Sequence, residues 1–219
     1  MSTRPLWIRL LSLALALAIA GPPAWAGPLT HAQALAALAR PNAAKRLAGV
    51  ERLGTLGTMA DADRLLPSLA DDDERVRAAT VAALWQIWGR SGDPQIDRLY
   101  ARGLAQMQAA ELTGALATFD QIVARKPAFA EGWNKRATIL FLMGENERSL
   151  KDCEEVFKRN PNHFGALAGA GQIQLQLGNL RLALNFFRQA LRVNPNLDGA
   201  AQVIPLIEEQ LRSDDASRT

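Results

Sequence analysis

The sequence predicts an all-α protein built as an α-solenoid, a stack of helical hairpins. Three prolines, Pro127, Pro161 and Pro195, stand 34 residues apart, and apolar or small residues recur at the same stride. A helical hairpin of this length cannot bury its apolar face alone, so successive hairpins are expected to share one continuous core. The in-phase sets are Leu99, Trp133 and Leu167; Gly103, Ala137 and Gly171; Leu116, Leu150 and Leu184; and Ile122, Val156 and Ala190.

Residues 1–26 have the pattern of a signal peptide that is cleaved on export. Arg4 and Arg9 precede an uncharged apolar run at residues 10–20, and a small-residue cleavage site follows at residues 24–26. A bilayer span needs about 20 apolar residues, more than this run provides. We therefore expect an exported protein without a retained membrane span. A bacterial periplasm is the expected location, and secretion is the alternative.

Charge and cysteine content limit the classes of partner and of covalent stabilisation. The formal net charge is +3, and Arg4 and Arg9 of the leader contribute two of these charges. A nearly neutral mature chain lacks the basic surface that neutralises phosphates, so nucleic acid is not the expected partner. A single cysteine, Cys153, excludes an internal disulfide. We expect Cys153 to be a small buried apolar residue, with a reactive thiol as the alternative.

Residues 29–92 form a first helical segment. They are rich in Ala and Leu at helical spacing, and Thr30 with Gln33 matches a capping box at a helix start. A weaker echo at 31 residues pairs Val50 with Val81. The acidic entry at residues 71–79 resembles the second-helix entry of HEAT-like repeats. We expect this HEAT-like segment to pack end-on against the helices that follow.

The 34-residue pattern itself begins at Asp93-Pro94, an N-cap followed by a first-turn proline. Gly144 and Gly178 mark the turns inside the second and third helix pairs, and Ala110 holds that place in the first. The helix pairs are predicted at residues 94–109 with 111–125, 129–142 with 146–160, and 163–177 with 179–193.

These helix pairs resemble tetratricopeptide repeats, whose signature is W-x2-L-G-x2-Y, then A-x3-F, then P. The three repeats run from about 94–127, 128–161 and 162–195. The second departs from the signature, because Ser149 and Cys153 replace the usual Ala and Phe. The matching residues are Gly103, Ala115, Phe119 and Pro127; Trp133, Ala137, Leu140 and Pro161; and Gly171, Ala183, Phe187 and Pro195. The resemblance implies a right-handed α-solenoid.

A closing helix is predicted at residues 197–212, and residues 213–219 are predicted to be a disordered tail. Terminal units of a solenoid need an outer face that water tolerates, which the charged end of this helix provides. Pro205 falls inside the helix and should kink it or mark where its ordered part begins.

The resemblance also implies a binding surface, because in tetratricopeptide arrays the first helices line a concave groove that holds a peptide or a partner helix. An Asn on such a helix can bond a peptide backbone through both its donor and its acceptor. Glycines at 165 and 169 replace the basic residues of a carboxylate-binding clamp, so that clamp is not expected here. The predicted groove residues are Tyr100, Leu104, Gln108, Asn134, Lys135, Thr138, Phe141 and Gln172.

The sequence contains no pattern that predicts catalysis, a cofactor or a metal site. His31 and His163 are distant from each other and lack neighbours at metal-ligand spacing. The acidic run at residues 71–74 lacks the alternation and the glycine of a calcium loop. No glycine-rich phosphate loop or nucleophile turn is present in the sequence. We expect both histidines to cap helices or lie at the surface.

The predicted function is that of an exported scaffold or adaptor, not an enzyme, which binds a protein or peptide through the groove. The alternative is a non-catalytic accessory subunit of an envelope enzyme or assembly complex, contacting it through the HEAT-like face. Trp85 and Trp88, three residues apart on one helix, either form the junction between the two segments or are exposed aromatic anchors for a partner. The identity of the partner and the oligomeric state stay open.

Overall fold

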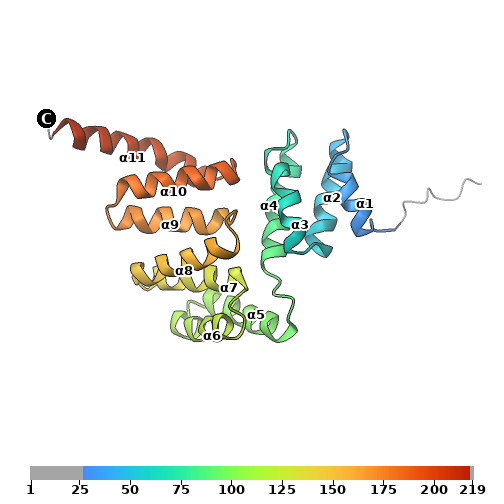
Figure 1. Ribbon diagram of the computed structural model, residues 1–219, viewed down its shortest axis with the longest axis horizontal. Coiled ribbons are helices and arrows are strands. Elements are labelled where there is room, and N and C mark those ends of the chain that lie inside the picture. The colour runs from blue at the N-terminus through green and yellow to red at the C-terminus, as the bar shows by residue number, and fades with distance from the viewer. Residues whose placement is uncertain (1–26, 218–219) are drawn as a thin grey trace, which may run out of the picture.

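The computed structural model describes residues 27–217, and within this range every regular element is a helix (Figure 1). The predicted signal peptide lies outside the described residues. In the described part, the longest helices are too short or too polar to cross a bilayer. The helices fall into an N-terminal segment and a stack of antiparallel pairs, as the predicted fold class requires.

The N-terminal segment, residues 27–92, is a set of short helices around its own core. A buried cluster that includes Leu53, Leu84 and Ile87 holds them together. The capping box predicted at Thr30 is present at the start of the first helix. The elements are α1 (His31–Ala37), α2 (Ala43–Leu56), α3 (Met59–Leu65), the 3₁₀ helix η1 (Leu66–Ala70) and α4 (Glu74–Trp88).

Three helix pairs follow, and each boundary lies within one residue of its predicted position. Small residues set how closely the helices of a pair approach. A Cβ at Gly103 would lie 2.5 Å from the Phe119 ring, and Gly171 faces Phe187 in the same way. The pairs are α5 (Pro94–Gln108) with α6 (Leu112–Arg125), α7 (Ala130–Leu142) with α8 (Asn146–Arg159), and α9 (Phe164–Gln176) with α10 (Leu180–Val193).

The closing helix, α11 (Asp198–Ala216), packs on α10 and is longer than predicted. Residues 213–216, predicted to belong to a disordered tail, continue the helix. Asp215 pairs with Arg181 at the start of α10, with an N–O distance of 2.9 Å. This ion pair connects the last turn of α11 to the preceding helix. Pro205 lies in the interior of α11.

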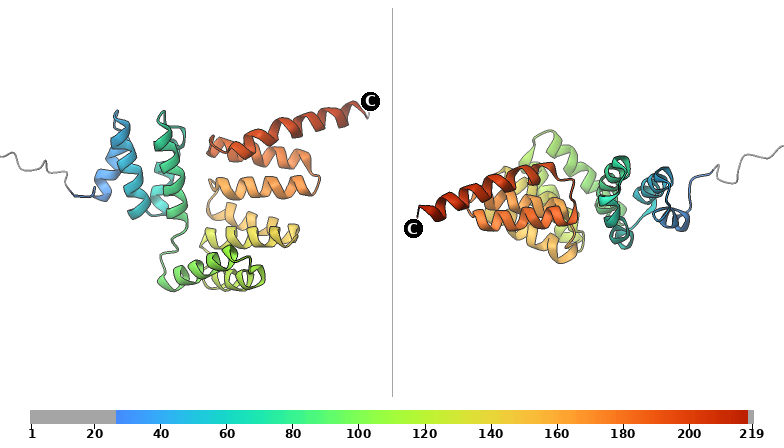
Figure 2. Two further views of the ribbon diagram at one scale, coloured as in Figure 1. Left: turned by 180° about the vertical axis from the view of Figure 1, so that it is seen from behind. Right: turned by 90° about the horizontal axis from the view of Figure 1, so that it is seen from above.

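The N-terminal segment does not pack end-on against the repeats, so that expectation was wrong. Helix α4 stands beside the stack, along the row of turns that connect one repeat to the next (Figures 1 and 2). Two of these turns bond to the segment. Asn162 Nδ2 donates to Asp63 Oδ1 at 3.4 Å, and Asn196 Nδ2 donates to the Leu69 carbonyl at 2.7 Å. The chain reverses after α4, and the stack then runs back along the segment from α5 to α11.

Candidate partner-binding face

The first helices of the pairs carry a stripe of residues spaced four apart, which places them on one side of each helix. On α7 the stripe passes through Asn134, Thr138 and Leu142. Its first turn is buried, whereas Thr138 and Leu142 are exposed. We call this surface of α5, α7, α9 and α11 the repeat face. The stripe is thus buried at the amino-terminal end of α7 and exposed at its carboxyl-terminal end.

At the buried end, the Glu131 carboxylate collects four hydrogen-bond donors. Glu131 is 1% exposed. Its Oε2 accepts from His163 Nε2 at 2.8 Å and from Asn134 Nδ2 at 3.0 Å. Its Oε1 accepts from Tyr100 Oη at 3.2 Å and from Lys135 Nζ at 2.9 Å. We call these five residues the Glu131 network.

Hydrogen-bond geometry fixes the tautomer of His163. The backbone N–H of Ala166, in the first turn of α9, donates to His163 Nδ1 at 3.0 Å, so Nδ1 carries no proton. Nε2 must then hold the proton that is donated to Glu131. The imidazole is therefore neutral, and Lys135 supplies the positive charge that balances the carboxylate.

The network shifts the pKa values of its members in opposite directions. Burial alone would raise the pKa of Glu131, but the hydrogen bond from His163 and the ion pair with Lys135 outweigh it, so this pKa lies below its ordinary value. Burial and the adjacent carboxylate raise the pKa of Tyr100. Glu131 is thus held as an anion inside the protein, and Tyr100 as a neutral donor.

Helix α4 covers this network with two aromatic rings. Trp88 stacks on His163 with ring centroids 4.5 Å apart, and Trp85 lies edge-on to the same ring at 5.3 Å. Lys135 Nζ lies 5.1 Å from the Trp85 ring centroid. A Cβ at Gly165 would come within 2.5 Å of Trp85, so the glycine leaves room for the ring. The N-terminal segment therefore occupies the first turns of the repeat face on α7 and α9.

Three predicted groove residues are buried or half-buried. Tyr100, Asn134 and Lys135 belong to the Glu131 network, so their polar groups bond within the chain. Trp85 and Trp88 form the junction between the segments, the first of the two alternatives that the sequence left open. Their role toward an external partner stays a prediction.

The other five predicted residues lie outside the network. Gln108, Thr138 and Gln172 are exposed, whereas Leu104 and Phe141 are half-buried. Leu104 packs in the core of the first pair, and Phe141 packs in the core between the second and third pairs. The part of the repeat face that the N-terminal segment leaves uncovered therefore lies toward the carboxyl ends of the first helices. We call it the open part of the repeat face.

The role of Glu131 and the burial of His163 were not predicted from the sequence. The capping role expected for His163 is confirmed at the start of α9, and the side chain is fully buried. Two of the three residues in phase with it, Phe129 and Leu197, are apolar, and the third is Gln95. That comparison could have indicated burial. For Glu131 the in-phase residues are Asp97, Gly165 and Gly199, which do not indicate burial.

Cys153 is buried among apolar neighbours, including Ala137 and Ile173. Burial raises the pKa of this thiol to about 12, so it stays protonated at neutral pH. His31 bonds Asp61 in the N-terminal segment, far along the chain from His163. Across residues 27–217, no three His, Cys, Asp or Glu side chains gather as a metal would require.

Two uncharged rows cross the open part of the repeat face at the 34-residue stride, one turn apart on each helix. Gln and Leu occupy all but one of their positions, and Leu142 and Leu206 are 58% and 70% exposed. The first row is Leu104, Thr138, Gln172 and Leu206, and the second is Gln108, Leu142, Gln176 and Gln210.

Comparison with known proteins identifies the family. The tetratricopeptide repeat model matches residues 130–163 and 165–197, close to the second and third predicted repeats. A TPR repeat-containing protein of Rhizobium etli is 31% identical over 150 residues, which cover 68% of this chain and 74% of that protein. The chain belongs to the tetratricopeptide repeat family. The HEAT-like character of the N-terminal segment stays a prediction.

Solved structures share the tetratricopeptide fold at low sequence identity. The first TPR domain of Spaghetti (RPAP3), bound to an HSP90 peptide, has a TM-score of 0.53 and 19% identity, covering 55% of this chain and 96% of that one. MamA protein has a TM-score of 0.52 and 17% identity, covering 73% of this chain and 88% of that one. These likenesses support the repeat architecture.

Proposed function

We propose that this tetratricopeptide repeat protein is an exported, non-catalytic scaffold that holds an uncharged peptide segment along the open part of its repeat face. The observation that carries the proposal is the pair of uncharged rows that cross this face. Glutamine amides donate to and accept from a peptide backbone, and exposed leucines offer apolar contact. The solved TPR domain of Spaghetti, bound to an HSP90 peptide, supports peptide binding as a use of this fold.

The chemistry of the rows also limits the partner. Charged residues make up 21% of the chain, yet none stands at any of the eight row positions. An acidic peptide would find no cation in these rows, and Lys135, on the preceding turn of α7, is paired with Glu131. The proposed ligand is therefore an extended or helical segment with apolar and amide side chains.

The rows can be tested by adding charge where the fold does not need the native residue. Leu142→Asp with Leu206→Asp changes two exposed side chains and should abolish partner binding without changing the thermal midpoint. Leu182→Asp is the matched control, because Leu182 is 49% exposed on the second helix α10. The measurement is the amount of partner that co-purifies with each variant. Full retention of the partner by the double variant would contradict the proposal.

Asn134 and Lys135 are unsuitable for this test. Their replacement would break the Glu131 network, so a loss of binding could not be separated from a loss of stability. Photo-crosslinking gives an independent measurement. A crosslinker at Gln172 on the repeat face should capture the partner, and one at Asn185 on α10 should not. Equal capture from both positions would exclude the repeat face as the binding site.

Export to the periplasm is part of the proposal and rests on the pattern of residues 1–26. Cell fractionation followed by N-terminal sequencing tests it. The expected product begins at Gly27 and lies in the periplasmic fraction. An intact Met1 start in the cytoplasmic fraction would contradict it.

The accessory-subunit alternative keeps one supporting observation. A cavity of about 270 Å³ opens between α1 and α2, lined mainly by apolar groups such as those of Leu29 and Ala36. If the N-terminal segment makes the main contact, a crosslinker at Ala36 should capture the partner and one at Gln172 should not. The same crosslinking series therefore separates the two functions.

A further inference from the structure

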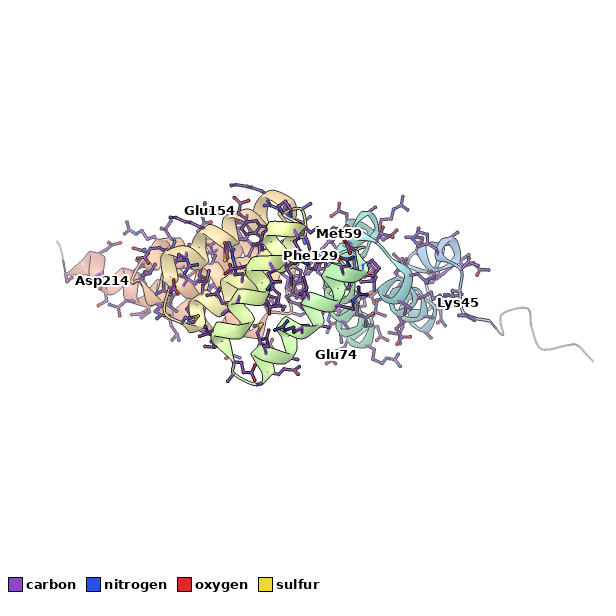
Figure 3. All side chains as sticks on the ribbon, turned by 90° about the horizontal axis from the view of Figure 1, so that it is seen from below. Lys45, Met59, Glu74, Phe129, Glu154 and Asp214 are labelled. Atoms are coloured by element: carbon purple, nitrogen blue, oxygen red, sulfur yellow. The ribbon has the colours of Figure 1, made fainter. Side chains whose placement is uncertain are left out.

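A cavity of about 350 Å³ lies where the N-terminal segment meets the turn between the first and second repeats. Asn162 and Asn196 occupy equivalent positions in the next two inter-repeat turns and bond across to the segment. The equivalent residue in the first turn is Ala128, which lines the cavity and has no polar group in its side chain. Figure 3 views this region from below, with Met59 and Phe129 of its wall labelled.

The charged residues that line the cavity are all basic: Arg90, Lys126 and Arg159. Arg159 pairs with Glu155 at 2.7 Å. Arg90 instead donates to the carbonyls of Gly54 and Gly57, which do not neutralise its charge. Asp97 and Asp93 lie within electrostatic range of Arg90 and Lys126 but do not line the cavity, so the lining itself carries only positive charge, which favours an anionic ligand.

Two buried hydrogen-bond donors in the wall lack an acceptor. Trp88 Nε1 and Asn160 Nδ2 have no partner among the described residues, although these residues are only 3% and 6% exposed. Both residues line the cavity. Buried donors in native proteins are nearly always satisfied, so these two N–H groups indicate an acceptor that the chain itself does not supply.

The start of α7 also borders the cavity. Phe129 is the N-cap of this 13-residue helix and makes no side-chain capping bond, whereas His163 caps α9. Phe129 and Ala130 both line the cavity. A helix N-terminus favours an anion, and the buried Glu131 carboxylate in the same first turn already balances part of that charge.

The rest of the wall is apolar, with Trp88, Phe129 and Met59 contributing rings and a thioether. We propose that the cavity binds a carboxylate joined to a small apolar group, as in an aromatic organic acid or the C-terminal residue of a peptide. The carboxylate accepts from Trp88 and Asn160, and the apolar group packs on the rings. A phosphate would leave the apolar wall unfilled. This site is separate from the repeat face and does not depend on the function proposed for it.

Isothermal titration of the purified chain tests the site with two probes that carry the same chemistry. One is 3-phenylpropionate, paired with 3-phenylpropionamide. The other is acetyl-Gly-Phe with a free C-terminus, paired with its C-terminal amide. At least one acid should bind saturably with one-to-one stoichiometry, at least tenfold more tightly than its amide. Tighter binding of 3-phenylpropionate identifies a small acid, and tighter binding of the dipeptide identifies a chain terminus.

Variants assign the binding to this cavity. Lys126→Glu should weaken the acid at least tenfold, because it reverses a charge at the cavity wall. Trp88→Phe keeps a ring but removes the N–H group and should weaken binding several-fold. Lys151→Glu is the matched control on the exposed side of α8 and should change the affinity less than twofold. Circular dichroism checks that each variant is folded, and Lys126→Glu carries the test if Trp88→Phe is not.

Three results would overturn the proposal. The first is that neither acid binds saturably, which would mean that the two donors are satisfied by buried water alone. The second is equal affinity for acid and amide, which would indicate an apolar pocket without anion recognition. The third is equal weakening by Lys126→Glu and Lys151→Glu, which would place the binding elsewhere on the chain.

Discussion

Among single residues, Glu131 determines which part of the repeat face is closed. An isolated carboxylate is costly to bury, and Glu131 is tolerated because donors from three parts of the chain converge on it. Tyr100 comes from the first repeat, Lys135 from the second, and His163 from the turn before the third. Because the polar groups of these side chains bond the anion, an external ligand would have to compete with Glu131 for them.

The buried anion predicts a pH dependence of stability. Glu131→Gln should lower the free energy of unfolding by about 3 kcal/mol at pH 7, because it removes one charge of a buried ion pair. The folded-state pKa of Glu131 lies below its ordinary value of 4.5, so its contribution is complete above that pH and is lost as the pH falls through the folded-state pKa. The difference between wild type and variant should therefore shrink as the pH falls from about 5 to about 3, a range that spans the ordinary pKa.

Urea unfolding followed by circular dichroism at several pH values measures this difference. Glu147→Gln is the control, since Glu147 is exposed on α8. The control should change stability by less than about 0.5 kcal/mol at every pH. If the gap between wild type and Glu131→Gln stayed constant down to pH 3, the carboxylate would not be the group that titrates.

For these single residues, the sequence predicted which of them share one side of α7 but not which other side chains cover that side. The 34-residue phase placed Asn134 and Lys135 on the side of α7 that carries the repeat face, and the spacing of Glu131 and Lys135 is that of a helical ion pair. Their burial depends on Trp85 and His163, which lie far away in the chain. Periodicity describes one element at a time, so it could not show which distant side chain covers that face.

At the scale of elements, the turn inside each repeat requires a left-handed backbone. The φ angles are 79° at Gly144 and 76° at Gly178, and the first repeat has Ala110 there with φ of 58°. A residue with a Cβ pays about 1–2 kcal/mol in this region, whereas glycine does not. The first repeat therefore carries strain that the other two lack.

This strain can be removed or introduced by one substitution. Ala110→Gly should stabilise the protein by about 1 kcal/mol, which corresponds to a rise of about 2–4 °C in the thermal midpoint. Gly144→Ala should destabilise it by about 1–2 kcal/mol for the same reason. Differential scanning calorimetry measures both. A lower midpoint for Ala110→Gly would show that flexibility of the unfolded chain outweighs relief of the turn.

The 34-residue repeat pattern was sufficient to predict the helices of the repeats, because each helix boundary depends on local caps, glycines and prolines. The pattern was insufficient to predict how the N-terminal segment packs against the repeats. The bonds of Asn162 and Asn196 to the segment span 99 and 127 residues of sequence. The equivalent asparagines look like ordinary turn residues in the sequence. Their second role depends on the chain reversal after α4, which no repeat pattern encodes.

At the scale of the whole molecule, the two segments share a core. Phe164 belongs to the third repeat, yet it packs in the buried cluster of the N-terminal segment with Leu65 and Trp88. Val193 and Leu197, from the end of that repeat and the turn after it, are packed against the same cluster. Solenoids are often described by contacts between neighbouring repeats only. Here a segment at one end of the sequence also contacts the third repeat, so the two parts should unfold cooperatively.

Phe164→Ala tests this cooperation, because the residue is 2% exposed and its loss should cost about 3–5 kcal/mol. Native-state hydrogen exchange should show faster exchange in α2 and α4 as well as in α9, since the cavity opens in the core they share. Phe119→Ala is the matched control, buried within the first pair, and should speed exchange mainly in α5 and α6. If α4 kept its protection in Phe164→Ala, the two segments would unfold independently. The N-terminal segment could then move away from the first turns of α7 and α9 without unfolding the third repeat. Protection lost together in α4 and α9 would instead mean that the closed part of the face opens only when the third repeat itself unfolds.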